Sequence, residues 1–122
     1  MKKQLEKWQD APWPDENIVH QNETFVVYKD GYPVTEGHLL FVPKTLDHVN
    51  IVQCFGAAYN WGNTGVNDGE FEAYNIGFNA GTVAGQTVMW PHVHLIPRRQ
   101  GDVEKPQGGI RHVIPRKGAY KL

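Results

Sequence analysis

The chain has 122 residues, of which 40% are hydrophobic and 20% are charged, and its formal net charge is −1. This length suits one domain with a real core and is too short for two, and the composition is that of a globular rather than a disordered chain. The N-terminal segment lacks the apolar stretch of a signal peptide, and no stretch approaches the roughly 18 apolar residues of a membrane span. We therefore expect a single cytoplasmic domain over residues 1–122.

Charge is distributed unevenly along this domain. Residues 1–97 hold 5 basic and 11 acidic side chains, whereas residues 98–122 hold 7 basic and 2 acidic ones. The expected folded core covers about residues 17–99, and a Gly/Pro-rich basic tail follows over residues 100–122. Such a tail either raises the local concentration of a polyanion or is simply solvated, and the sequence leaves both readings open.

The single cysteine restricts the chemistry further. Cys54 has no partner for an internal disulfide, and a Cys-rich zinc site is excluded for the same reason. It lies in a segment with helical spacing and is expected to be a small buried apolar residue rather than a nucleophile.

Short elements are expected in the first part of the chain. Residues 1–8 suggest a short helix, which the prolines at positions 12 and 14 would end. Two short strands follow, over residues 18–20 and 24–28. The turn residues of 30–33 then lead to a third strand over residues 38–42, which Pro43 stops.

One long helix and two more strands are expected in the second part. Between about Asn50 and Thr64 the apolar residues recur at helical spacing, and three glycines punctuate the end of this segment. Alternating patterns return at residues 73–79 and 91–97. This order of elements predicts an α+β fold, with an antiparallel sheet of about five strands and one long helix packed on one face.

Alternation along these strands assigns their side chains to two faces, because residues two apart on a strand point the same way. One face is predicted to be the core that the helix covers, with the members Leu39, Phe41, Ile76, Phe78, Val93 and Leu95. The other face is predicted to be a polar site, with the members His38, Asn75, Asn79, His92 and His94.

The most informative pair on the polar face is His92 and His94. A single histidine on a strand is more often a bystander than a working group. Two in phase are poor core fillers, yet they suit phosphate, proton or metal chemistry because both titrate near neutrality. The pair is therefore the first candidate for a functional site.

Several segments together resemble the histidine triad (HIT) family of nucleotide hydrolases and transferases. They are Gly37-His38-Leu39-Leu40-Phe41-Val42-Pro43-Lys44, Asn79 six residues before Gly85, Gly85-Gln86-Thr87-Val88, Pro91-His92-Val93-His94-Leu95-Ile96-Pro97-Arg98, and the tail pieces at 101–103 and 108–115. The resemblance spans roughly residues 24–116. Each piece is weak alone, and their combination is specific. The resemblance also implies a homodimer, because many members join their sheets edge to edge.

One position departs from the family pattern His-x-His-x-His, because Trp90 stands where the first histidine belongs. The resemblance implies that His92 is the nucleophile and that His94 helps to bind phosphate and the leaving-group oxygen. Attack through one ring nitrogen needs an acceptor for the proton on the other, and the Trp90 backbone can still supply that carbonyl. We expect the missing imidazole to remove a supporting polar contact that involves His38.

The resemblance gives the remaining candidates substrate-binding roles. Asn79 and Thr87 would donate to nonbridging phosphoryl oxygens, and Gln86 would lie near the bridging oxygen of the leaving group as a third catalytic residue. Asp30 matches an acceptor for ribose hydroxyls, although an aspartate that caps a loop is the simpler reading. His38 is also expected at the substrate site. Asn79 precedes Ala80-Gly81 and has a plain reading as a turn residue.

These observations predict a nucleotidyl hydrolase or transferase that acts at the α-phosphate of a nucleotide through a covalent nucleotidyl-histidine. The expected substrate is a dinucleoside polyphosphate or a nucleoside phosphoramidate. No tightly bound cofactor is expected, although Mg²⁺ can arrive with a polyphosphate substrate. Neither a membrane nor a specific nucleic acid is expected as a partner. Two alternatives stay open. One is a nucleotide sensor without turnover, and the other is a zinc or copper site on His38, His92 and His94, which would leave Asn79, Gln86 and Thr87 without a role.

Overall fold

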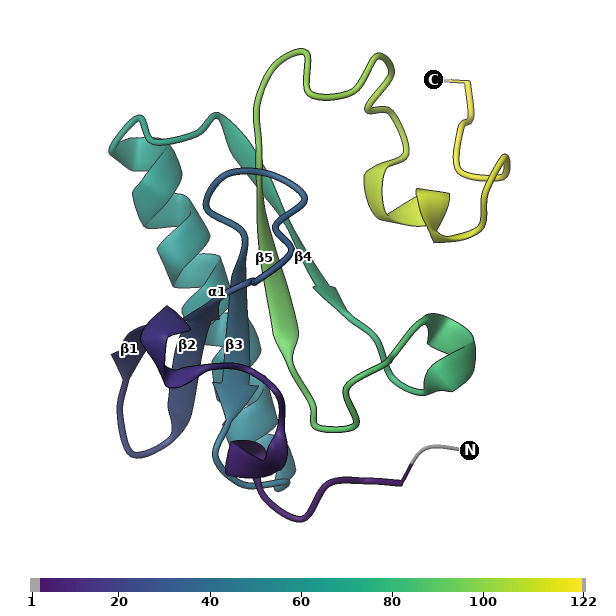
Figure 1. Ribbon diagram of the computed structural model, residues 1–122. Helices are drawn as coiled ribbons and strands as arrows, with labels where there is room; N and C mark the ends of the chain where they lie inside the picture. Colours follow the sequence, from purple (N-terminus) through teal and green to yellow (C-terminus); the bar gives the residue numbers. More distant parts are fainter. Residues whose placement is uncertain (1–2, 122) are drawn as a thin grey trace.

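A computed structural model describes residues 3–121 and shows an antiparallel sheet of five strands with one long helix (Figure 1). The strands are β1 (Ile18–Gln21), β2 (Phe25–Lys29), β3 (Leu39–Pro43), β4 (Ala73–Phe78) and β5 (Val93–Arg98), and the helix is α1 (His48–Asn67). Their order in the sheet is β1-β2-β3-β5-β4, with every neighbouring pair antiparallel. The predicted α+β fold is thereby confirmed.

Helix α1 covers one face of the sheet. It begins after Asp47, whose side chain accepts a hydrogen bond from the Asn50 amide and caps the first turn. Its inner side packs onto the face that the alternation predicted. The buried core residues are Val27, Phe41, Cys54, Ala58, Val93 and Leu95, with Leu39, Ile76 and Phe78 packed against them. The predicted core face and the apolar role of Cys54 are therefore confirmed.

The helix is longer at both ends than the predicted range of about Asn50 to Thr64. Two glycines that suggest its end lie inside it and allow a close approach. A Cβ atom at Gly62 would lie 2.8 Å from the Tyr74 ring, and one at Gly65 would overlap the Phe71 ring. These glycines bring the helix onto β4 and the chain before it rather than ending it.

The opposite face of the sheet holds a second apolar cluster. Its buried members are Val26, Tyr28, Leu40, Val42 and Trp90, and the N-terminal segment contributes Leu5, Trp8, Trp13 and Ile18 at the edge. The predicted polar face is thus only partly polar. Alternation did not indicate that the N-terminal segment folds back over this face, because that contact joins residues far apart in the sequence.

The short helix predicted for residues 1–8 is wrong over residues 3–8, and Met1 and Lys2 lie outside the described residues. The segment instead runs across the second apolar cluster, where the Leu5 amide donates to the Met89 carbonyl at 3.0 Å. Only a 3-10 turn over Trp8–Asp10 is helical there. Pairing with a distant backbone carbonyl replaces the local bonds that a helix would need.

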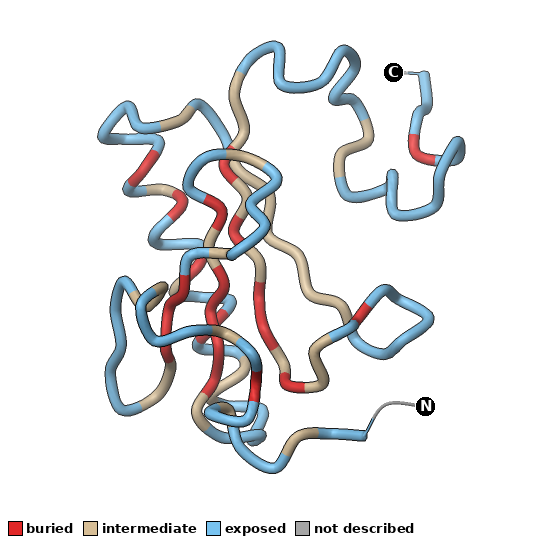
Figure 2. The backbone as a smooth tube through the Cα atoms, in the orientation of Figure 1, coloured by how far each residue is buried: buried red, intermediate tan, exposed pale blue. Residues whose placement is uncertain are grey.

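The C-terminal segment differs from the rest of the chain in its burial. Figure 2 shows buried residues concentrated on the central strands and a largely exposed chain after β5. This segment contains a 3-10 turn over Gly109–Val113, and the Arg111 Nε atom donates to the Gly118 carbonyl at 2.9 Å. No helix within residues 3–121 is long and apolar enough to cross a membrane.

Candidate active site

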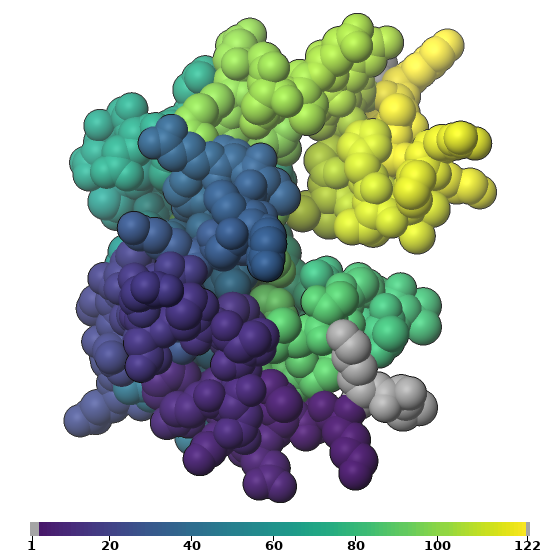
Figure 3. Space-filling view, in the orientation of Figure 1, coloured from purple at the N-terminus to yellow at the C-terminus, as the bar shows by residue number. Residues whose placement is uncertain are grey.

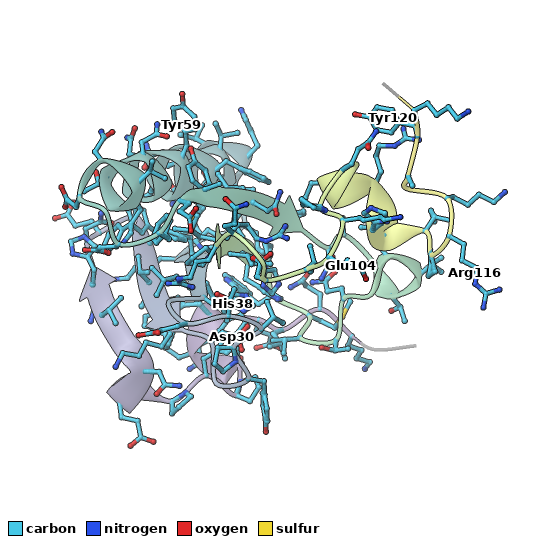
Figure 4. All side chains as sticks on the ribbon, turned by 90° about the horizontal axis from the view of Figure 1, so that it is seen from above. Asp30, His38, Tyr59, Glu104, Arg116 and Tyr120 are labelled. Carbon is cyan, nitrogen blue, oxygen red and sulfur yellow. The ribbon has the colours of Figure 1, made fainter. Side chains whose placement is uncertain are left out.

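A cavity of about 530 Å³ lies on the sheet face opposite α1. It is lined by Pro12, Trp13, Pro14, Asp30, Gly31, Tyr32, Val34, His38, Leu40, Asn79, Gly85, Thr87, Val88, His92 and His94. In Figure 4, Asp30 and His38 lie on one side of the sheet and Tyr59 of α1 lies on the other. Of the eight residues predicted for the site, six line this cavity, and Gln86 and Trp90 do not.

The elements bring the histidines together in a simple way. His38 directly precedes β3 and His92 directly precedes β5, which is paired with β3. His94 lies within β5 opposite Leu40, on the same face as the two strand-end histidines. The imidazole of His94 therefore lies between the other two, 5.1 Å from the His38 ring and 5.2 Å from the His92 ring.

The hydrogen bond of His92 fixes which of its nitrogens carries the proton. Its Nδ1 atom lies 2.7 Å from the Trp90 carbonyl oxygen, which only accepts. The neutral ring is therefore protonated on Nδ1 and holds a lone pair on Nε2. Burial lowers the pKa of His92, against smaller raising effects of the Trp90 carbonyl and of Asp30. A neutral ring with a free Nε2 lone pair is the form that attacks phosphorus.

His38 is held in the opposite tautomer. The Val34 amide donates to its Nδ1 atom at 3.2 Å, so the proton of the neutral ring is on Nε2. That Nε2 atom lies 2.9 Å from His94 Nδ1 and 3.2 Å from Asp30 Oδ2. Burial lowers the pKa of His38, and the nearby Asp30 carboxylate opposes that shift.

The tautomer of His94 follows from that of His38. Because His38 Nε2 is a donor, the His94 Nδ1 atom 2.9 Å away has to accept, which leaves the proton of His94 on its own Nε2. Burial and then the neighbouring His92 and His38 lower the pKa of His94 to about 4. The site at neutral pH therefore pairs a lone pair on His92 Nε2 with an N–H donor on His94 Nε2.

Asp30 supports this arrangement through both carboxylate oxygens. One oxygen accepts from the Tyr32 amide at 2.7 Å, and the other lies 3.2 Å from His38 Nε2. The aspartate thus caps its loop and also contacts the histidine cluster from the wall of the cavity. The ribose contact that the resemblance implies remains a prediction.

The side chain of Gln86 holds the loop between β4 and β5. Its Oε1 atom accepts from the Gly81 amide at 2.8 Å, and its Nε2 atom donates to the Val88 carbonyl at 3.0 Å. The structure therefore does not bring this amide into the cavity, whereas Asn79 and Thr87 at the two ends of the loop line it. The leaving-group role predicted for Gln86 finds no support in this geometry.

Trp90 occupies the second apolar cluster. Its side chain is 2% exposed, and its Nε1 atom donates to the Pro43 carbonyl at 2.8 Å. The expected gap in the contacts of His38 is absent, because both ring nitrogens of His38 have partners elsewhere. The Trp90 backbone carbonyl thus contacts His92, while its indole fills the core; the role of this residue in the reaction stays a prediction.

One cluster has the spacing of metal ligands. The ligand atoms of Asp30, His38 and His94 lie within 4.8 Å of one another. A metal ion would need the lone pair of His38 Nε2, but the Val34 amide directs the proton to that atom. His94 Nδ1 in turn already accepts from the same N–H. The hydrogen bonds of this cluster therefore do not fit a resident metal ion.

Sequence reasoning missed one residue that touches His92. The Trp13 and His92 rings have centroids 5.0 Å apart and planes 69° apart. The available signal was the sequence Pro12-Trp13-Pro14, since a residue before proline is restricted to extended backbone and the flanking rings stiffen it. That pattern presents an aromatic ring rigidly, but it does not identify the partner.

The HIT domain family model matches residues 13–101, which include every residue predicted for the site. The chain belongs to the HIT family. An uncharacterized HIT-like protein of Methanocaldococcus jannaschii is 33% identical over 107 residues, covering 71% of this chain and 72% of the relative. Membership supports nucleotide binding or nucleotide hydrolase and transferase chemistry at a general level.

Solved structures agree with this assignment. A Zn-bound histidine triad family protein from Mycobacterium smegmatis has a TM-score of 0.67 and 28% identity, with 77% of this chain and 71% of that one covered. The C. elegans NitFhit protein has a TM-score of 0.66 and 27% identity, covering 82% of this chain but 26% of that larger chain. Each shares the fold of this domain.

Proposed function

We propose that this HIT-family chain is a nucleotidyl hydrolase or transferase that forms a covalent intermediate on His92. The observation that carries the proposal is the 2.7 Å bond between His92 Nδ1 and the Trp90 carbonyl, which leaves Nε2 unprotonated in a ring that lines the cavity. The substrate class is a dinucleoside polyphosphate or a nucleoside phosphoramidate, whose α-phosphate would lie against the histidines.

The first step forms a P–N bond between His92 Nε2 and the α-phosphorus. The bond from phosphorus to the leaving group breaks, and the leaving group takes its electron pair; an amine leaving group also takes one proton from water. The N–H of His94 Nε2 donates a hydrogen bond to the leaving atom or to a nonbridging oxygen, because its Nδ1 atom is held as an acceptor. Asn79 and Thr87 line the same cavity and would bond the other phosphoryl oxygens.

The second step returns His92 to its starting form. Water or another acceptor attacks phosphorus, the P–N bond breaks and its electron pair returns to Nε2, while the proton of the acceptor leaves with solvent or product. Splitting one displacement into two is the advantage of a covalent intermediate. The bond to the Trp90 carbonyl stabilises the positive charge that the ring carries while nitrogen is phosphorylated.

No resident metal ion takes part in this proposal. The M. smegmatis relative is named as Zn-bound, but the donor on His38 Nε2 does not match a zinc ligand in this chain. Mg²⁺ would enter only as the counterion of a polyphosphate substrate.

Release of nucleoside monophosphate tests this function directly. The parent protein should release it from a dinucleoside polyphosphate or from an adenosine phosphoramidate, and chelator should leave phosphoramidate hydrolysis unchanged. Rapid quenching with a labelled substrate should trap one label per chain on His92. Nucleotide binding without release or label would support the sensor alternative, and loss of activity with chelator would support a metal site.

We also propose a homodimer, formed through the edge of the sheet at β4. Strand β4 has β5 on one side and no strand on the other within residues 3–121. Two exposed aromatic residues of α1 adjoin that edge. Phe55 lies 5.5 Å from the Phe78 ring of β4, and the Tyr59 carbonyl accepts from the Tyr74 hydroxyl. An unpaired edge beside exposed aromatic side chains suits pairing with a second copy.

Sedimentation tests the homodimer. The parent protein should sediment at twice the 13.8 kDa of one chain at micromolar concentration. Tyr59→Glu places a charge beside the edge strand and should weaken the dimer, while the exposed Val19→Glu on β1, at the opposite edge of the sheet, is the matched control. A parent protein that sediments as a monomer would contradict the proposal.

A further inference from the structure

The contact between Trp13 and His92 goes beyond the residues that the family pattern assigns. The two centroids lie 5.0 Å apart, and the planes are tilted by 69°. Trp13 also packs against Tyr28, with centroids 5.6 Å apart, so its indole bridges the second apolar cluster and the cavity. Among the described residues, the other ring in contact with His92 is the imidazole of His94.

We propose that Trp13 is a positioning residue that fixes the rotation of the His92 imidazole and keeps water from one side of that ring. This inference rests on the proposed function of His92. A single hydrogen bond to the Trp90 carbonyl holds one edge of the ring but still allows the ring to rotate about that bond. Packing against neighbouring side chains is therefore needed to keep Nε2 directed at the phosphate. The Trp13 ring and the His94 ring, 5.2 Å away, supply that packing.

The Trp13 ring is itself held on a stiff segment. Prolines on both sides restrict its backbone, and Ala11, two residues earlier, is buried. Figure 3 shows the N-terminal segment as the purple surface that closes the lower part of this side of the molecule. An indole placed this way can support the imidazole without moving when substrate enters.

The electrostatic surroundings of His92 give the expected direction of change. Among the described residues, the Asp30 carboxylate raises the pKa of His92, His92 in turn lowers the pKa of His94, and Asp15 of the N-terminal segment raises the pKa of Tyr28. Burial lowers the pKa of His92 more than Asp30 raises it. Removal of the indole admits water, so the pKa of His92 should rise toward its ordinary value.

The decisive experiment is an NMR titration of the His92 ring without nucleotide, combined with the rate constant of nucleotidyl transfer. Trp13→Ala should raise the pKa of His92 and slow transfer by about tenfold to 100-fold with little change in KM. Trp13→Phe should keep most of both properties. Trp13→Leu retains apolar volume and should fall between them, which keeps the test valid if the alanine variant unfolds.

Trp61→Ala is the matched control, because Trp61 makes the same kind of ring contact with His20, at 5.7 Å and 60°, on the α1 side of the sheet. It should leave the His92 titration and the transfer rate unchanged. An unchanged or lower pKa of His92 in Trp13→Ala would overturn the proposal, as would a change confined to KM. If the parent transfers no nucleotidyl group, the proposed function fails, while the titration still decides whether Trp13 shields His92.

Discussion

The two faces of the sheet contrast in how they are covered. Regular helix α1 covers one face, and the buried core residues that it packs against are apolar. The other face is covered by an irregular N-terminal segment. Part of this face is the apolar cluster around Trp90, and another part is the cavity that the histidines line. Buried polar groups require partners, and every buried side-chain nitrogen and oxygen in the described chain has one.

This difference separates stability from chemistry. A helix can cover apolar side chains because those side chains need only close packing. The histidines, in contrast, need specific hydrogen-bond donors and acceptors at fixed positions. Those partners come from loop backbone, the Val34 amide and the Trp90 carbonyl. Irregular chain on the second face therefore sets the tautomers that the proposed reaction uses.

The largest expected effect comes from removing the proposed nucleophile. His92→Ala should reduce turnover by at least about 10³-fold, because no other lone pair is presented to phosphorus. Nucleotide affinity should stay within about tenfold, or about 1.4 kcal/mol. Steady-state assays and equilibrium binding measure the two quantities separately.

His20→Ala is the control for this variant, since His20 is exposed on β1 and lies outside the cavity. It should have the activity of the parent protein. If His92→Ala also kept the activity of the parent protein, the assignment of His92 as the nucleophile would be wrong.

The second expected effect tests the apolar part of the same face. Trp90→His removes most of a side chain that is 2% exposed, so it should lower the free energy of unfolding by about 2–4 kcal/mol. The new imidazole should give no gain in transfer rate, because His38 already has partners for both ring nitrogens. Urea denaturation and single-turnover kinetics measure these effects.

Trp90→Phe separates volume from hydrogen bonding in this position. It keeps the apolar ring but leaves the Pro43 carbonyl without its donor, at a cost of about 1–3 kcal/mol. A faster nucleotidyl transfer in Trp90→His would show that the indole hinders the site and would contradict its assignment to the core.

Much of the difference between the two faces of the sheet can be predicted from the sequence. Alternation along β3, β4 and β5 gave the core members that α1 covers, and the spacing of His92 and His94 gave the site. Periodicity reports burial but not partners, so it did not show that Gln86 bonds its own loop or that Trp90 donates to Pro43. For contacts between distant segments, such as Trp13 with His92, no local pattern identifies the partner.

The third prediction concerns the pH dependence of stability. The pKa of His94 is lowered to about 4 in the folded chain, from an ordinary value of 6.5. Between these values the unfolded chain binds a proton that the folded chain does not, so stability falls as the pH falls from 6.5 to 4. The full contribution of this group is on the order of 3 kcal/mol.

Unfolding measurements across this pH range check the sign. The difference in unfolding free energy between the parent and His94→Asn should be constant above about pH 7 and should decrease toward pH 4. A difference that grows as the pH falls would mean that His94 is charged in the folded protein.

The smallest expected effect concerns the loop that borders the cavity. Gln86→Leu removes two hydrogen bonds within residues 81–88, each contributing about 0.5–1.5 kcal/mol. The Gly81 amide should then exchange its hydrogen faster, while the amides of β3 keep their protection. Unchanged exchange at Gly81 would show that the backbone alone holds the loop.

The most direct test of the account is the tautomer of each histidine at neutral pH, read from ¹⁵N NMR shifts of the ring nitrogens. The hydrogen bonds predict a neutral His92 with its proton on Nδ1, and neutral His38 and His94 with their protons on Nε2. This pattern presents one lone pair and one N–H donor to the phosphate. A proton on His92 Nε2, or a charged His92 ring at pH 7, would contradict the assignment of His92 as the nucleophile.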